Sequence, residues 1–377
     1  LKIVYRFLLH LKYLLLLFFL NCFLISSDNS PLVKALWVVR DHMVSKELID
    51  SVLDFAETNG FNHIFAQVRG RGDAYYNSSF VPKSHLVDAE FDPLEYLINS
   101  NKSNNIKIHA WINIYYLWSS KLLPKQKKHL LLKNPEWLDR SNKDKYIKTF
   151  QYLSDKNSMK IDGEGFYLAP TNPSVKDYLL NVISELSENY LVDGIHYDYI
   201  RFHNTKYGFN ETGLTEFRTL NKINSINYHE DNNVIFSEFK RNSITSFVKE
   251  SKELIKRNLP NSIISAAVKP NIYDAKLLFF QEWDLWLSAG YLDWAVPMNY
   301  VVDNDKFVQN MYMIKDNIPS QYHKKIIVGI STYNQGARVV GKKIKRLSKM
   351  SFNNISIFSY TVFVDNPYYW KKLKRYF

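Results

Sequence analysis

The stretch from Asp193 to Arg201 (Asp-Gly-Ile-His-Tyr-Asp-Tyr-Ile-Arg) places one aspartate at each end of a short apolar run, with an arginine after the second. The apolar centre predicts a buried strand, and a buried strand is normally apolar throughout. Asp198 and Arg201 at its exit therefore need a functional explanation. Two carboxyl groups on either side of a ligand can carry out acid–base and nucleophilic chemistry, as the cleavage of a glycosidic bond requires.

Asp198 is the first candidate for a catalytic carboxyl because it ends the strand. We expect Arg201 to keep Asp198 ionised, which suits a nucleophile or base better than an acid. The alternative is a structural Asp–Arg pair at the rim of the fold. His196 should share a strand face with Asp198, since residues two apart point the same way; it would bond Asp198 or a sugar hydroxyl, or be a satisfied core histidine. Asp193 starts the strand and is expected to be a cap or turn residue.

The second carboxyl has several candidates. Glu164 lies in a long loop between about residues 113 and 173, and long loops in compact domains are usually functional. Asp73 and Asp41 are the rivals, because each follows a predicted strand. Taken singly, each of these residues favours a structural role over a catalytic one. We therefore predict Asp198, Glu164 and Asp73 as the catalytic set.

The elements that must position these residues follow from alternating apolar runs and helical patterns. Eight runs read as strands, and they are Val33–Val39, His63–Val68, Ile106–Ile112, Asp193–Asp198, Ser262–Val268, Leu292–Met298, Lys325–Ile330 and Ile355–Tyr360. Seven helices are predicted between them, at Ser45–Asn59, Pro93–Ser103, Ser174–Asn189, Glu238–Arg257, Asp274–Ala289, Phe307–Asp316 and Gly336–Met350. Residues 202–236 are expected to be a long polar connection. This alternation predicts an α/β protein, a single (β/α)8 TIM barrel with long βα loops over residues 31–377.

The carboxyl ends of barrel strands meet at one mouth, whatever their separation in sequence. The expected substrate-binding residues at these ends are Arg40, Asp41, Arg69, Trp111, Asn113, His196, Arg201, Lys269, Asn299, Tyr300 and Tyr333. Amides and carboxylates bond hydroxyl groups, and aromatic rings cover the apolar face of a sugar. The arginines can also hold an acidic sugar substituent. No glycine-rich phosphate loop follows any strand, which argues against a nucleotide ligand.

The composition narrows the class of protein. The chain has 377 residues, a formal net charge of +12 and one cysteine, Cys22. A single cysteine excludes an intrachain disulfide and zinc sites built on cysteine pairs. The positive charge favours anionic surroundings, but no nucleic-acid-binding motif accompanies it, so we expect no nucleic-acid partner. We also expect no metal and no cofactor. The oligomeric state is not predicted.

The first 30 residues have the pattern of a targeting segment. Lys2, Arg6 and Lys12 precede an apolar run from Tyr13 to Ile25, and a polar stretch follows. This order is typical of a secretory signal peptide. An uncleaved membrane anchor is the alternative, since no small-residue cleavage site is clear, and lipidation at Cys22 is a further one. We therefore expect an exported protein of the cell envelope or extracellular space, with possible anchoring through residues 1–30.

Several stretches together resemble one family. They are residues 35–40, 65–76, 109–113, 134–138, 193–201, 293–300 and 357–360, with sequences such as Ala-Gln-Val-Arg-Gly-Arg-Gly-Asp and Trp-Ala-Val-Pro-Met-Asn-Tyr. They run in order through nearly the whole chain after residue 33. On these residues the chain resembles the glycoside-hydrolase-like family 10 proteins, bacterial envelope (β/α)8 barrels. The resemblance implies a glycosidase that acts on peptidoglycan or another envelope glycan, and it carries over no assigned acid/base pair.

Two positions depart from the expected patterns. Phe202-His203 stands where the family usually has Tyr-Pro, and Ile200 stands where chitinase-like barrels place a glutamate. A chitinase-type mechanism would therefore lack its proton donor at Ile200. The leading prediction is a glycoside hydrolase with a polysaccharide substrate. A barrel that binds envelope glycan without cutting it is the alternative, and lyase or deacetylase chemistry is a third possibility.

Overall fold

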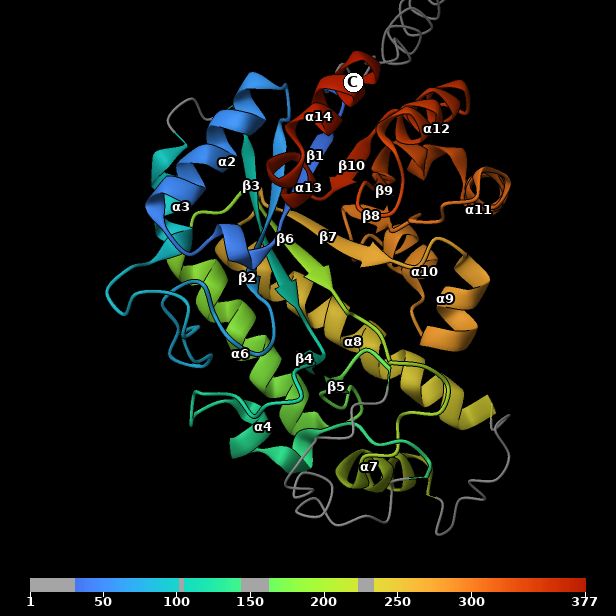
Figure 1. Cartoon of the computed structure of the whole chain (residues 1–377). Helices are drawn as coiled ribbons and strands as arrows, with labels where there is room; N and C mark the ends of the chain where they lie inside the picture. The colour runs from blue at the N-terminus through green and yellow to red at the C-terminus, as the bar shows by residue number, and fades with distance from the viewer. Residues whose placement is uncertain (1–30, 102–104, 144–162, 223–233) are drawn as a thin grey trace, which may run out of the picture. The chain divides into compact units, whose positions relative to one another are not determined.

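Parallel strands and helices alternate along the chain, as the sequence pattern predicts. The structure, a computed structural model, describes residues 31–101, 105–143, 163–222 and 234–377. The barrel strands are β1 (Lys34–Val38), β2 (His63–Arg69), β3 (Lys107–Asn113), β6 (Gly194–Asp198), β7 (Ile263–Val268), β8 (Trp294–Pro297), β9 (Val328–Ser331) and β10 (Ile355–Phe358). All eight strand predictions are confirmed. Figure 1 shows these strands at the centre of the molecule with the helices around them.

The strands pair in the order β8-β7-β6-β3-β2-β1-β10-β9, and every pair is parallel. The first strand lies between β2 and β10, so Ala35 faces His63 on one side and Ser356 on the other. The first and last strands of this order, β8 and β9, are joined by two parallel bridges, Ala295–Ile326 and Met298–Gly329. The sheet therefore forms a nearly closed barrel, and the seam between β8 and β9 is its most weakly paired part.

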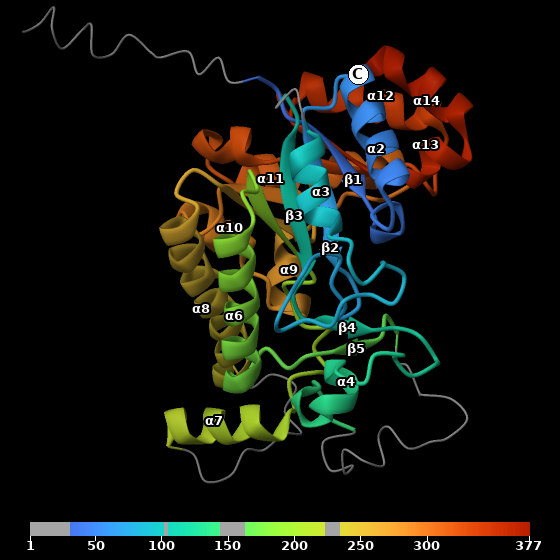
Figure 2. The same cartoon turned by 90° about the vertical axis from the view of Figure 1, so that its left-hand side faces the viewer.

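Most of the helices lie around the outside of the sheet, and two of them, α4 and α7, lie below it in the view of Figure 2. The helices are α2 (Lys46–Thr58), α3 (Pro93–Ser100), α4 (Leu130–Lys133), α6 (Pro173–Asn189), α7 (Glu211–Asn221), α8 (Val234–Asn258), α9 (Ile272–Phe279), α10 (Trp283–Ser288), α11 (Asn304–Asn317), α12 (Ala337–Lys349), α13 (Thr361–Asp365) and α14 (Pro367–Leu373). Ser45 caps α2 as predicted, with its side chain accepting a hydrogen bond from the Leu48 amide. Such a cap satisfies one of the free amides of the first turn.

Two helix predictions need correction. The helix predicted over Asp274–Ala289 is divided into α9 and α10, because Phe280 adopts a left-handed conformation with φ +56°. A phenylalanine gives no sequence signal for such a break. The connection predicted over residues 202–236 contains α7, which Asn210 caps.

The long loop after β3 has its own structure. It carries a two-stranded antiparallel sheet of β4 (Tyr116–Trp118) and β5 (Phe166–Tyr167). The amide of Ile114 donates to the carbonyl of Asp198, and that of Tyr115 donates to Tyr199. These bonds hold the start of the loop against the carboxyl end of β6. The loop is therefore an integral part of the mouth of the barrel.

The core has two layers, one inside the barrel and one between the strands and helices. The inner cluster is built from Val33, Ala35, Trp37, Phe65, Trp111, Ala267, Val296 and Ile327. The outer cluster contains the alternate strand residues, such as Leu36, Ile64 and Ile195, packed on the helices. Strand residues with a period of two therefore separate the interior of the barrel from its outer shell.

Residues 33–377 form one compact unit. The predicted targeting segment, with Cys22, lies outside the described residues. Among the helices that the structure describes, none combines the length and apolarity needed to cross a bilayer.

Candidate active site

A cavity of about 570 Å³ opens at the carboxyl ends of the barrel strands. Nine of the predicted site residues line it, and they are Arg40, Trp111, Asn113, Glu164, Asp198, Arg201, Lys269, Tyr300 and Tyr333. The prediction missed eight further lining residues, which are Trp37, Val39, Gln67, Arg71, Tyr116, Tyr199, Met298 and Phe358. The lining combines carboxylates, guanidinium groups, amides and aromatic rings.

Asp198 ends β6 and is the most buried carboxyl of the cavity wall, with 6% of its surface exposed. Its Oδ1 accepts a hydrogen bond of 2.7 Å from the amide of Tyr199. Burial raises the pKa of Asp198 to about 6, because it outweighs the opposing effects of this hydrogen bond and of the nearby Arg201. A good part of the Asp198 population is therefore protonated in mildly acidic solution.

Tyr199 holds the chain in an uncommon conformation next to Asp198. Its φ is +49°, in the left-handed region that bulky residues rarely adopt. Its ring stacks on Tyr116 of β4, with ring centroids 4.4 Å apart. Backbone strain of this kind persists only where the surroundings enforce it, and it is concentrated at functional sites. Here it turns the chain sharply between Asp198 and Arg201.

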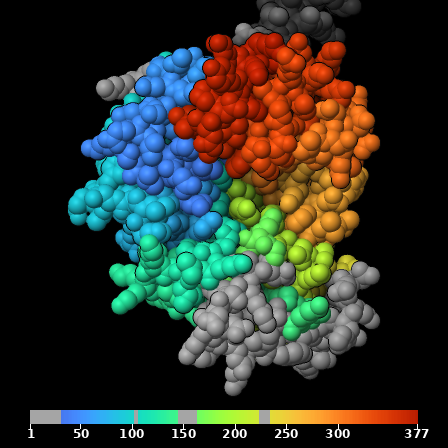
Figure 3. Space-filling view, in the orientation of Figure 1, coloured from blue at the N-terminus to red at the C-terminus, as the bar shows by residue number. Residues whose placement is uncertain are grey.

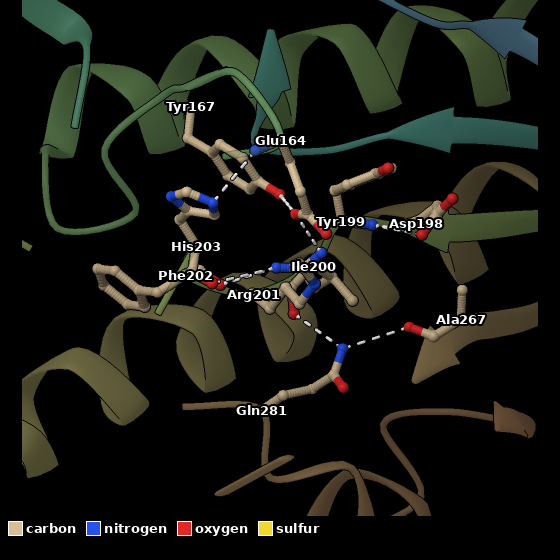
Figure 4. A network of polar contacts seen from close by, with 10 residues as sticks. All are labelled: Glu164, Tyr167, Asp198, Tyr199, Ile200, Arg201, Phe202, His203, Ala267 and Gln281. Atoms are coloured by element: carbon tan, nitrogen blue, oxygen red, sulfur yellow. Dashed lines mark hydrogen bonds and ion pairs between the residues drawn. The ribbon is translucent and has the colours of Figure 1, made fainter. Parts of the chain in front are cut away.

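Glu164, the second carboxyl, precedes β5 and reaches the cavity from the long loop. Its Oε2 lies 2.7 Å from Arg201 Nη2 and accepts a hydrogen bond of 2.5 Å from the Tyr167 hydroxyl (Figure 4). Burial raises the pKa of Glu164, but Arg201 and Tyr167 outweigh it, so the net pKa lies below the ordinary value. Gly165 follows at φ +133°, and a Cβ there would lie 2.3 Å from the Trp118 carbonyl oxygen. Only glycine fits this turn.

The expected ion pair between Asp198 and Arg201 is a wrong prediction, since Arg201 pairs with Glu164. The guanidinium group of Arg201 is buried, 5.1 Å from the ring centres of both Tyr199 and Phe279. Its Nη1 donates to the Phe202 carbonyl at 3.2 Å. Arginine tolerates such an environment because its planar charge is delocalised and stacks well on rings. Arg201 thus fixes Glu164 as an ionised group.

Two further side chains hold this arrangement in place. Gln281 donates to the carbonyls of Ile200 and Ala267 and accepts from the Lys269 amide, so it joins the exits of β6 and β7 (Figure 4). His203 stacks on Tyr167 at 5.2 Å, and its Nε2 lies 3.5 Å from the amide of Glu164. His203, which stands where the family usually has proline, therefore supports the loop that carries Glu164.

Basic groups surround the two carboxyls. Arg40, Arg71, Arg201 and Lys269 all line the cavity. Arg40 donates to Gln67 Oε1 from both its amide and its guanidinium group, each at 3.3 Å. Burial, followed by the repulsion of Arg201, lowers the pKa of Lys269 to about 8. At neutral pH the cavity therefore carries more positive than negative charge.

Two lining residues, Trp37 and Tyr300, have a buried donor without a hydrogen-bond partner among the described residues. These donors are the indole nitrogen of Trp37 and the hydroxyl of Tyr300. Tyr300 also packs on Phe358, and the exposed ring of Tyr333 extends this aromatic wall toward the rim.

Five predicted site residues lie outside the cavity lining. Arg69 follows a register shift in β2 and donates to the carbonyls of Asn113 and Ile114. The bulge turns it away from the inner face on which Gln67 lies. Asn299 bonds Phe307 and Asn310 of α11, because it falls one residue after the inward-facing Met298.

The other three lie in different places. Asp73 accepts a hydrogen bond of 2.9 Å from the Arg71 amide and shapes the loop after β2. The Asp41 side chain is 68% exposed and lies 3.9 Å from Arg40. His196 points into the barrel as expected, but below the cavity, where its Nδ1 lies 2.8 Å from Ser265 Oγ. It does not bond Asp198.

Across the described ranges, the structure holds no group of three or more His, Cys, Asp or Glu side chains that fits a metal ion. The cavity lining contains two carboxyl groups, Asp198 and Glu164, in unlike environments. Burial raises the pKa of one, and an ion pair lowers the pKa of the other. A pair of carboxyls with separated pKa values is the usual arrangement of an acid and a base in one site.

Solved structures with a similar barrel include domains of known glycosidases. The glycoside hydrolase domain of PgaB (BpsB) from Bordetella bronchiseptica matches with a TM-score of 0.69 and 10% identity, over 91% of this chain and 98% of that one. The catalytic domain of a β-amylase from Paenibacillus polymyxa matches with a TM-score of 0.59 and 11% identity, over 91% and 97%. At these identities the likeness shows a shared TIM-barrel fold.

Two proteins found by sequence comparison have a higher sequence identity to this chain than these solved structures. Glycosyl hydrolase DigH of Escherichia coli is 26% identical over 168 residues, which are 42% of this chain and 35% of DigH. Glycosyl hydrolase YngK of Bacillus subtilis is 24% identical over 155 residues, 39% of this chain and 26% of YngK. The matched part is thus about a third or less of each relative. The family model described as glycosyl hydrolase-like 10 matches residues 28–346, most of the chain, and the resemblance seen in the sequence is confirmed: the protein is a member of the glycosyl hydrolase-like 10 family.

Proposed function

We propose that this protein is a glycoside hydrolase that cleaves a bacterial envelope polysaccharide, the glycan strands of peptidoglycan. Asp198 acts as the general acid and Glu164 as the base or nucleophile. The observation that carries the proposal is the unlike state of the two carboxyls on one cavity wall: burial raises the pKa of Asp198 to about 6, whereas Arg201 and Tyr167 keep Glu164 ionised. The proposal reverses the role that the sequence alone suggested for Asp198.

The roles follow from what each group does in glycoside hydrolysis. The acid must be protonated to donate to the leaving oxygen, and a buried carboxyl with a raised pKa is suited to that step. The other carboxyl must be ionised to activate water or attack the anomeric carbon. The ion pair with Arg201 stabilises the ionised form of Glu164 in the free enzyme. Tyr167 and Arg201 thus position Glu164.

The lining of the cavity supports an anionic glycan as the substrate. Arg40, Arg71 and Lys269 carry positive charge that the two carboxyls do not balance. Arginine binds carboxylate groups in a bidentate geometry. Tyr300, Tyr333 and Trp37 supply aromatic rings of the kind that bind sugars. Peptidoglycan combines sugar rings with carboxylate groups. A targeting segment at residues 1–30 would bring the enzyme to it.

The second candidate is a barrel that binds envelope glycan without cutting it. A single carboxyl, paired with Arg201 and closed off from the mouth, would favour that function. The presence of both Asp198 and Glu164 in the cavity lining favours hydrolysis.

The test is digestion of purified peptidoglycan, with the released fragments identified by mass spectrometry. We expect fragments from the unmodified protein and none from Asp198→Asn or Glu164→Gln. Asp41→Asn is the matched control, because the Asp41 side chain is 68% exposed and lies outside the cavity lining. Binding of the glycan without release of fragments by the unmodified protein would support the second candidate.

A further inference from the structure

The last part of the chain carries a positively charged surface that lies away from the cavity. Five exposed basic residues lie on α12, and the last four of them are Lys342, Lys345, Arg346 and Lys349. Four more lie on α14 and the 3-10 helix η4 (Lys374–Tyr376), namely Lys371, Lys372, Lys374 and Arg375. We call these eight side chains the basic face. Residues 337–349 and 367–377 contain no aspartate or glutamate.

Packing joins the two halves of the basic face. Gly341 of α12 lies so close to Tyr376 that a Cβ on it would be 2.4 Å from the ring. The ammonium group of Lys345 lies 5.0 Å from the centre of the same ring. Because Gly341 has no side chain, η4 packs directly on α12, and their lysines form one continuous surface. In Figure 3 this red surface lies next to the blue surface of the first elements of the barrel.

The basic face lies beside the amino-terminal end of the first barrel strand. Lys34, the first residue of β1, donates from its Nζ to the Phe377 carbonyl at 2.7 Å. The cavity lies at the other end of the strands. The apolar run of residues 13–25 precedes β1 in the sequence, and β1 itself begins beside the end of η4.

Neighbouring elements carry some acidic residues. They are Asp365 at the end of α13, Asp54 and Glu57 on α2, and Asp303, Asp305 and Asp316 at the cap of α11 and on α11, which packs on α12. Two apolar side chains also project beside the lysines, with Tyr368 72% exposed and Val364 49% exposed. Tyrosine is enriched at the headgroup level of membranes, where its ring is apolar and its hydroxyl remains hydrated.

We propose that the basic face docks on the surface of an anionic phospholipid bilayer. Clusters of four to eight basic residues are typical of surfaces that bind anionic lipid. The exposed Tyr368 and Val364 add a shallow apolar contact that a purely ionic partner would not need. Docking on this face turns the cavity away from the bilayer, toward material outside the membrane. The surface acts together with a hydrophobic segment before β1, because membrane attachment becomes stable when two weak signals combine.

The test is sedimentation of the full chain with two kinds of vesicle, one of phosphatidylcholine alone and one that also contains phosphatidylglycerol. The measured quantity is the ratio of the two partition coefficients, which removes the contribution of any apolar segment. Lys371→Glu/Lys372→Glu/Lys374→Glu alters the basic face. Lys125→Glu/Lys127→Glu/Lys128→Glu is the matched control, since these exposed lysines precede α4 and lie elsewhere on the surface. Both variants change the net charge equally.

We expect the unmodified chain to prefer the anionic vesicles and to lose this preference as salt is raised. The basic-face variant should lower the ratio by about 10- to 100-fold, whereas the control should change it less than about threefold, on the order expected for charges remote from the bilayer. An equal fall of the partition ratio in both variants, or a ratio near one for the unmodified chain, would overturn the proposal. So would loss of binding to purified cell-wall polymer, with vesicle binding unchanged, in the basic-face variant. A melting curve shows that each variant is folded.

Discussion

The mouth and the lower half of the barrel interior both contain ionisable side chains, but those at the mouth keep their charge and those in the lower half do not. At the mouth, Glu164 and Arg201 stay charged because they pair with each other at 2.7 Å beside an open cavity. In the lower half, three buried histidines lie among aromatic rings, with His63 Nδ1 2.9 Å from His109 Nε2 and His196 stacked on Phe65. We call His63, His109 and His196 the histidine layer.

Burial holds the histidine layer neutral. It lowers the pKa of His63 to about 4 and that of His196 to about 3, and it places the pKa of His109 well below the ordinary value. The difference between the two regions shows that burial alone removes charge, whereas burial with a partner of opposite charge keeps it. Asp198 is intermediate between the two regions. It is buried at the mouth, but the nearby Arg201 forms its ion pair with Glu164 and not with Asp198.

The largest expected effect is on catalysis, and it separates the two carboxyls of the mouth. Asp198→Asn should lower cleavage of the natural glycan by about 10²- to 10⁴-fold, the usual contribution of a general acid. On an aryl glycoside whose leaving group needs no proton, the activity of Asp198→Asn should fall only slightly. Glu164→Gln should be inactive on both substrates. Steady-state rates on the two substrates check this, and equal losses for Asp198→Asn on both would contradict the assignment of the acid.

The next effect is on stability in acid, and it tests the histidine layer. In the unfolded chain a histidine takes up a proton below about pH 6.5, whereas in the folded state His63 and His196 stay neutral until about pH 4 and 3. The unfolded state thus binds more protons, and the free energy of unfolding should fall by about 1.4 kcal/mol per pH unit for each such histidine below pH 6.5. Urea denaturation at several pH values measures the slope.

A variant sharpens this prediction. His196→Phe with Ser265→Ala replaces the pair whose Nδ1–Oγ distance is 2.8 Å without leaving a buried hydroxyl unpaired. It should reduce the slope of stability against pH below 6.5. The exposed His85→Phe is the control and should leave the slope unchanged. A slope that the double variant does not alter would show that His196 contributes nothing to acid lability.

A smaller effect is expected from Tyr167→Phe, which removes one of the two partners of Glu164. The pKa of Glu164 should rise, because a hydrogen bond to its ionised form is lost. The acidic limb of the pH–activity profile should therefore move to higher pH, with about a tenfold loss of kcat/KM. Tyr96→Phe is the matched control, since its hydroxyl bonds Asp50 on the surface. An acidic limb that stays in place would contradict the role of Tyr167.

The smallest effect is expected at the rim of the mouth. The Tyr333 ring is 60% exposed and continues the wall formed by Tyr300 and Phe358. Tyr333→Ala should raise KM by about fivefold, as expected for the loss of one ring contact, with kcat unchanged. Tyr312→Ala on α11 removes a ring of similar exposure (51%) and should change neither constant. A fall in kcat with unchanged KM would argue against a role in substrate binding.

Much of the mouth could be predicted from the sequence, because each barrel strand is a local apolar run and its exit carries the polar residues. Trp111, Asn113 and Asp198 were found in this way. Trp37 and Gln67 were missed although a signal exists: each lies inside a strand at the period-two spacing that faces the interior. Gln67 is a polar residue within the otherwise mostly apolar run His-Ile-Phe-Ala-Gln-Val-Arg, which indicates that its side chain has a polar environment inside the barrel.

The pairing of Glu164 with Arg201 could not be predicted. It depends on β4 and β5, which pair across about 50 residues of loop without any local signal for their register. The direction of Arg69 depends on a bulge in β2, and that of Tyr199 on a left-handed backbone conformation. These features come from tertiary packing, so a pattern of residue types along the chain does not contain them.

The most direct test of the account is the pH dependence of kcat/KM, which reports the ionisation of essential groups in the free enzyme. We predict that activity falls as pH rises through about 6, because Asp198 then loses the proton that it must donate. Asp198→Asn, assayed on the aryl glycoside, should lack this basic limb and keep the acidic limb of Glu164. A basic limb that persists unchanged in Asp198→Asn would contradict the central claim that buried Asp198 is the acid of this site.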